Sequence, residues 1–127
     1  MEFFGGGDLF DYLKKRNFEV SEARIREIFY QLSQAIYYLH SIGIVHRDIK
    51  LENVMMTDNS GTAKAKLIDF GLAKILGPKD KSNDIFGTFG YCAPEVIMGK
   101  SYSVGVDVWS LSVMLYVMLS EYLPFDS

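Results

Sequence analysis

The sequence predicts a mainly α-helical fold with one small antiparallel β hairpin, and three observations carry this prediction. Apolar residues recur at three- and four-residue spacing over residues 21–41, as on one face of a helix. Two short apolar segments, 54–56 and 65–68, flank a stretch of turn-forming residues at 58–61. A third apolar region, residues 107–120, has apolar side chains in nearly every direction around a helix.

The chain opens with a glycine-rich elbow at residues 5–7, followed by a short predicted helix. Asp8 is placed to cap this helix, because an Asp side chain accepts hydrogen bonds from the first free N–H groups. Leu9, Phe10 and Leu13 are expected to form its apolar face.

The long helix is predicted from about Ser21, the N-cap, to about Ser41, with Gly43 ending it. Its apolar stripe consists of Ile25, Ile28, Phe29, Leu32, Ala35, Ile36 and Leu39.

Beyond the hairpin, residues 71–90 have the composition of a loop. Pro94 occupies the first position of a short helical turn that Gly99 closes. The final helix is expected to begin near Asp107, which locally resembles an N-cap, and to be buried on all sides.

Composition narrows the class of protein. The 127 residues make one domain at most. Hydrophobic residues make up 49% of the chain and charged residues 23%, a balance that suits a protein with a packed core. A net charge of −3 argues against nucleic-acid partners and against an anionic membrane surface. The single cysteine, Cys92, cannot form an internal disulfide, so we expect an intracellular protein, in the cytoplasm. The apolar run 108–119 is too short to span a bilayer.

The informative motifs are His46-Arg47-Asp48, with Asn53 five residues after the Asp, then Asp69-Phe70-Gly71, then Ala93-Pro94-Glu95. In this order they resemble the signature of the protein kinase family. Any one of the motifs alone would carry little weight. The resemblance covers residues 1–127 and implies part of the C-terminal lobe of a kinase fold, from the hinge to the buried helix after Ala-Pro-Glu.

The resemblance implies a set of catalytic roles in the transfer of the ATP γ-phosphate to a hydroxyl. Asp48 would orient the attacking hydroxyl and accept its proton, and Lys50 would stabilise charge on the moving phosphoryl group. Asn53 and Asp69 would bind Mg²⁺, which prefers hard oxygen ligands. A Lys two residues after the Asp, as at Lys50, resembles serine/threonine kinases and not tyrosine kinases. Thr88 would bridge Asp48 and Lys50.

The resemblance also implies nucleotide contacts. Met1 would occupy the gatekeeper position, and Glu2 (carbonyl) and Phe4 (N–H) would pair with the adenine edge. Met55 would form the apolar floor beneath the ring. A plain core methionine on a strand would fit Met55 equally well, and the sequence alone leaves both readings open.

Two acidic residues are candidates for substrate recognition. Asp8 falls where many kinases that prefer basic substrates carry an acidic residue, although its N-cap role explains it equally well. Glu52 lies beside the expected acceptor, whereas Val117 replaces a second Glu found in some relatives. We therefore expect a modest preference for one upstream Arg or Lys in a protein substrate with a Ser or Thr acceptor.

Regulation is expected at Arg47, which in many kinases pairs with a phosphorylated residue of the activation loop. Here Asp84 stands at that place, and a fixed carboxylate supplies charge without phosphorylation. This pattern resembles the calcium/calmodulin-dependent and calcium-dependent kinases, which leaves room for a calcium-sensor extension outside this chain. Ser82 is the alternative switch.

Two further implications concern structure and completeness. His46 would pack beneath Phe70, and Asp107 would accept hydrogen bonds from the catalytic-loop backbone. The Gly-rich loop, the strand Lys and its partner Glu of a kinase N-terminal lobe would lie before Met1, so the 127-residue chain alone is expected to be inactive and marginally stable. The alternative is a truncated kinase-like binding or scaffold module.

Overall fold

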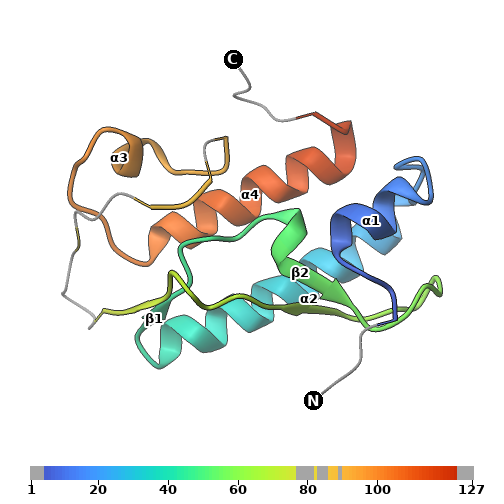
Figure 1. Ribbon diagram of the computed structural model, residues 1–127, viewed down its shortest axis with the longest axis horizontal. Coiled ribbons are helices and arrows are strands. Elements are labelled where there is room, and N and C mark those ends of the chain that lie inside the picture. The colour runs from blue at the N-terminus through green and yellow to red at the C-terminus, as the bar shows by residue number, and fades with distance from the viewer. Residues whose placement is uncertain (1–4, 77–81, 83–85, 89, 123–127) are drawn as a thin grey trace.

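The computed structural model describes residues 5–76, 82, 86–88 and 90–122, and within them the chain is mainly helical (Figure 1). Asp84, Met1, Glu2 and Phe4, which carry four of the predicted roles, lie outside the described residues. The elements are α1 (Leu9–Lys14), α2 (Glu22–Ser41), β1 (Ile44–Val45), the 3₁₀ turn η1 (Leu51–Asn53), β2 (Val54–Met56), β3 (Ala65–Leu67), β4 (Lys74–Ile75), α3 (Pro94–Ile97) and α4 (Gly105–Ser120).

The helix starts follow from the predicted caps. The carboxylate of Asp8 accepts a hydrogen bond from the N–H of Asp11 at 2.8 Å, and the hydroxyl of Ser21 accepts one from the N–H of Arg24 at 3.1 Å. Gly43 follows α2 with a φ of 79°, a conformation that glycine adopts without steric cost. The sequence signals for these helices are therefore confirmed.

The predicted hairpin is present as β2 and β3, which pair antiparallel with Val54 opposite Leu67. A second antiparallel pair, β1 with β4, was not predicted: Ile44 lies opposite Ile75 and Val45 opposite Lys74. The prediction of a continuous loop over residues 71–90 was therefore wrong at β4. Each of these strands has two residues, too few to show an alternating pattern in the sequence.

The core lies between the two long helices, α2 and α4, which run alongside each other, with the β2–β3 hairpin against α2 (Figure 1). Its fully buried residues include Leu13, Ile28, Leu32, Val54 and Met114. A smaller cluster beside it joins β1 to the region of α3 and consists of Val45, Leu76, Ala93, Val96, Tyr102 and Val106.

Three details of the helices differ from the predictions. Phe10 is 38% exposed, and Tyr12 fills the core from α1 instead. Helix α4 begins at Gly105 with Val104 as its N-cap residue, so Asp107 lies inside the first turn and is not the cap. Nor is α4 buried on all sides, since Val108 is 54% exposed and Leu119 is 56% exposed.

Among the described helices, none has the length and apolar character required to cross a bilayer.

The glycine elbow is bound to the edge of the hairpin. The N–H of Gly6 donates to the carbonyl of Met56, whose own N–H donates to the carbonyl of Gly7 at 2.9 Å. A Cβ at Gly6 would collide with the carbonyl oxygen of Asp58 and lie 2.8 Å from Cβ of Met56. Only glycine fits this close approach of two backbones.

We predict that Gly6→Ala destabilises the full-length protein by about 1–3 kcal/mol, because the backbone carbonyl of Asp58 cannot move without breaking the hairpin contacts. Gly61 is the matched control, since a Cβ there meets nothing within 4 Å. Gly61→Ala should be neutral, or stabilising by at most about 1 kcal/mol. Urea unfolding of both variants measures the difference, and equal midpoints would refute this account of the elbow.

Candidate active site

The carboxylate of Asp107 is hydrogen-bonded to the backbone of the segment that carries Asp48. This carboxylate is 1% exposed and accepts hydrogen bonds from the backbone N–H groups of His46 at 2.8 Å and Arg47 at 2.9 Å. Its Oδ2 also lies 2.8 Å from Nε2 of His40 in α2. The implied role of Asp107 as an anchor for this loop is therefore confirmed, and His40 is an additional partner that sequence reasoning missed.

Two residues of the site have backbone conformations that side chains disfavour. Arg47 has a φ of 74° and Asp69 a φ of 59°, both in the left-handed region. Such conformations persist only where surrounding contacts enforce them. At Arg47 one such contact is the hydrogen bond from its N–H to Asp107.

His46 joins the Asp48 loop to the Asp69 segment. Its ring is fully buried, and Nδ1 accepts a hydrogen bond from the N–H of Asp48 at 3.1 Å. Because Nδ1 accepts, the proton belongs on Nε2, which lies 3.0 Å from the carbonyl oxygen of Ile68. The ring also packs edge-on against Phe70, with centroids 5.0 Å apart. The packing predicted for this pair is confirmed.

The carboxylate of Asp48 is contacted by three polar side chains from two segments of the chain. Its Oδ1 accepts a hydrogen bond from the hydroxyl of Thr88 at 3.2 Å and lies 3.9 Å from Nζ of Lys50. Nζ of Lys50 also donates to the Thr88 hydroxyl at 2.9 Å. Oδ2 accepts a hydrogen bond from Nδ2 of Asn53 at 3.0 Å. The contact geometry predicted for Thr88 is thus present.

Asn53 and Asp69 are brought into one neighbourhood by the backbone. The N–H of Ile68, directly before Asp69, donates to the carbonyl of Asn53 at 2.9 Å. Nδ2 of Asn53 donates hydrogen bonds to the carbonyl and carboxylate oxygens of Asp48. The side-chain oxygen of Asn53 is the atom of this amide that can bind a metal ion. Asp69 is an exposed residue, and Oδ1 of its carboxylate accepts a hydrogen bond from the N–H of Gly71 at 3.3 Å. One amide oxygen and one carboxylate suit Mg²⁺, which keeps water and phosphate oxygens in its other positions.

Met55 alternates with core residues along β2. Val54 and Met56 are fully buried, whereas Met55 is half-buried and absent from the core cluster. Since successive strand residues face opposite sides, Met55 lies on the side of the hairpin away from the core. This geometry disfavours the plain core alternative for Met55.

The two substrate candidates occupy different parts of the surface. Asp8 is half-buried and uses its carboxylate as the cap of α1. Glu52 is exposed in η1 beside Tyr91. Burial, with the charge of Glu52 as a smaller cause, raises the pKa of Tyr91 to about 12. Val117 is buried in α4.

Arg47 and Ser82 belong to one network near the small cluster. Nη1 of Arg47 donates to the hydroxyl of Tyr102 at 3.1 Å, and the backbone of Tyr102 pairs with that of Ser82. Ser82 is 6% exposed, and its hydroxyl accepts a hydrogen bond from Nζ of Lys74 at 3.1 Å. Tyr102 and Lys74 stand outside every motif, and no spacing in the sequence indicated them.

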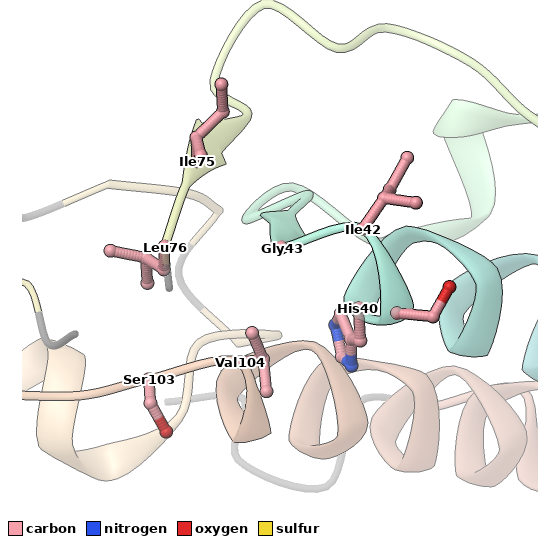
Figure 2. Close-up of a pocket in the computed structure, with 8 residues that line it drawn as sticks. His40, Ile42, Gly43, Ile75, Leu76, Ser103 and Val104 are labelled. Atoms are coloured by element: carbon pink, nitrogen blue, oxygen red, sulfur yellow. The ribbon is translucent and has the colours of Figure 1, made fainter. Parts of the chain in front are cut away.

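A pocket lies between the end of α2, strand β4 and the residues just before α4 (Figure 2). Its volume is about 440 Å³, and its lining includes His40, Ile42, Leu76 and Val104. The pocket contains none of the predicted site residues. It does reach His40, which contacts the anchor Asp107.

Comparison with known proteins gives one family. The model of the protein kinase domain matches residues 1–127. Calcium/calmodulin-dependent protein kinase type IV of Mus musculus is 39% identical over 125 residues, which cover 98% of this chain and 26% of the mouse protein. The Homo sapiens and Rattus norvegicus proteins of that name are each 38% identical with the same coverage. The chain thus spans about a quarter of the length of these relatives.

We predict that Cys92 in the folded protein is alkylated by iodoacetamide more slowly at pH 8 than in the urea-unfolded chain. Burial raises the pKa of the Cys92 thiol, and the nearby charge of Asp48 raises it further, so less of the reactive thiolate forms. Mass spectrometry of the Cys92 peptide over time measures the rate.

The variant Asp48→Asn isolates the electrostatic cause, because it removes the charge and keeps the size of the side chain. Alkylation of Cys92 should become faster in Asp48→Asn and stay unchanged in Asp11→Asn, an exposed carboxylate on α1. An identical rate in all three proteins would show that Asp48 does not lie beside Cys92.

Proposed function

Because this chain belongs to the protein kinase family, we propose that the full-length protein transfers the γ-phosphate of ATP to serine and threonine hydroxyls of protein substrates. The observation that carries the proposal is the set of three contacts to Asp48: Thr88 and Lys50 at one carboxylate oxygen, and Asn53 at the other. These contacts orient the carboxylate, and a positioned carboxylate is what acceptance of a hydroxyl proton requires.

In this mechanism Asp48 orients the attacking hydroxyl of the substrate and accepts its proton. Lys50 lies 3.9 Å from Asp48 and supplies positive charge where charge develops on the transferred phosphoryl group. Thr88 accepts from Lys50 and donates to Asp48, which fixes the two side chains relative to each other. Asn53 and Asp69 would hold Mg²⁺, and the ion would supply positive charge to neutralise the phosphate oxygens of ATP.

Nucleotide binding is proposed for Met1, Glu2, Phe4 and Met55. For Met55 the support is its position on the side of β2 away from the core. The glycine elbow directly follows the proposed hinge residues in the sequence, and its backbone is hydrogen-bonded to Met56 in β2, the strand that carries Met55.

Regulation is proposed at two levels. Within the chain, the carboxylate of Asp84 would pair with Arg47 in place of a phosphorylated residue. Phosphorylation of Ser82 is the alternative switch. The relatives are named as calcium/calmodulin-dependent, and we propose that any such control of this protein acts through segments outside residues 1–127.

We also propose an intracellular location, because the proposed reaction uses ATP and the sequence has a single cysteine.

The 127-residue chain alone is proposed to be inactive, because the Gly-rich loop and the strand Lys that kinases use for ATP phosphates are not in its sequence. The tests below therefore use the full-length protein. A full-length protein that transfers no phosphate to any peptide would favour the scaffold module instead.

We predict that Asp48→Asn lowers kcat for peptide phosphorylation by about 10²–10⁴-fold, the usual contribution of a positioned general base. ATP affinity should stay close to wild type, because Asp48 has no proposed contact with the nucleotide. Radiolabel transfer measures kcat, and calorimetry measures ATP binding.

The isosteric control is Asp11→Asn, which makes the same change on the exposed side of α1 and should leave kcat unchanged. Equal activity of Asp48→Asn and wild type, with both folded, would rule Asp48 out as the base.

We predict a modest preference for one basic residue upstream of the phosphoacceptor, since Asp8 and Glu52 offer carboxylates and Val117 is buried and uncharged. A positional peptide array measures this preference. Glu52→Gln should weaken it severalfold, as expected for loss of one exposed charge pair. An array that favours acidic upstream residues would contradict both assignments.

A further inference from the structure

The side chain of Arg47 is held by three groups from different segments. Its Nε donates to the carbonyl of Leu72 at 2.6 Å, and its Nη1 donates to the hydroxyl of Tyr102 at 3.1 Å. The guanidinium carbon lies 4.8 Å from the ring centroid of Phe86, within the range of a cation–π contact. Arg47 therefore connects the Asp48 loop to the segment after Asp69 and to the region before α4.

Tyr102 is built into this arrangement by its backbone and by its ring. It is 3% exposed, and its N–H and carbonyl exchange hydrogen bonds with Ser82 at 2.8 and 2.9 Å. Its ring packs against Phe86 with centroids 5.2 Å apart. These contacts fix the ring, so the hydroxyl reaches Arg47 from a rigid support.

The network closes on itself through Lys74. Nζ of Lys74 donates to the hydroxyl of Ser82, and the backbone of Lys74 in β4 pairs with Val45 in β1. Val45 directly precedes His46 and Arg47. A continuous ring of contacts thus leads from Arg47 through Tyr102, Ser82 and Lys74 back to the strand that feeds the Asp48 loop.

From this geometry we infer that Tyr102 is a positioning residue for the proposed phosphotransfer, acting through Arg47 on Asp48. The inference rests on the proposed function. Arg47 has a left-handed backbone and directly precedes Asp48, so the orientation of one constrains the other. The carboxylate of Asp107 accepts a hydrogen bond from the N–H of Arg47, and the hydroxyl of Tyr102 accepts one from its side chain. Loss of that hydroxyl removes one hydrogen bond to a charged group at a half-buried position.

The test is Tyr102→Phe in the full-length protein, which removes the hydroxyl and keeps the ring contact with Phe86 and the backbone pairing with Ser82. We expect kcat to fall about tenfold, the equivalent of one hydrogen bond to a charged group, with KM for ATP unchanged. Tyr37→Phe is the matched control, since Tyr37 is 78% exposed on α2, and it should leave kcat and the melting temperature unchanged.

A double-mutant cycle shows whether the effect passes through Arg47. Tyr102→Phe should lower kcat in the wild-type background and have no further effect in Arg47→Ala. If the activity of Arg47→Ala is too low to measure, Tyr102→Phe alone tests the inference: kcat should fall while KM for ATP stays unchanged.

The outcomes separate this inference from the proposed function. An active wild type with an equally active Tyr102→Phe overturns the inference alone, and so does an equal loss in both backgrounds of the cycle. A rise in KM for ATP at constant kcat would also overturn it. A folded wild type without phosphotransfer overturns the proposed function, and the inference with it.

Discussion

The buried carboxylate of Asp107 is the interaction on which the rest of the site depends. It joins the first turn of α4 to the end of α2 through His40, and to the loop before Asp48 through the N–H groups of His46 and Arg47. Hydrogen bonds to a charged group contribute about 1.5–3 kcal/mol each, enough to support the unfavourable backbone conformation of Arg47. The two long helices thereby fix the loop on which the proposed chemistry takes place.

Most of the fold could be predicted from local signals. The stripe of α2, its Ser21 cap and the β2–β3 hairpin each have a periodicity or turn composition that is complete within a short stretch of sequence. The β1–β4 pair could not be predicted, because two-residue strands separated by a long stretch of chain leave no pattern. The start of α4 was misplaced for a physical reason: Asp107 resembles a cap locally, but its carboxylate is used by a distant loop.

The site was predictable where motif order carried it and not elsewhere. Asp48, Asn53 and Asp69 follow from the resemblance to kinases, and so does the bridging position of Thr88 between Asp48 and Lys50. The contacts of Tyr102 with Arg47 and of His40 with Asp107 form only in the folded chain, so nothing in the spacing of these residues marked them. Such contacts decide how the recognised residues are oriented, which is the part of function that a motif leaves out.

We propose above all that Asn53 and Asp69 share one Mg²⁺ beside the carboxylate of Asp48. The most direct measurement is a crystal structure of the full-length protein with Mg²⁺ and a non-hydrolysable ATP analogue. We predict the amide oxygen of Asn53 and a carboxylate oxygen of Asp69 at about 2.0–2.1 Å from the same ion, with the terminal phosphate between that ion and Asp48. An ion bound elsewhere, or carboxylates of residues 48 and 69 that face separate surfaces, would contradict the account.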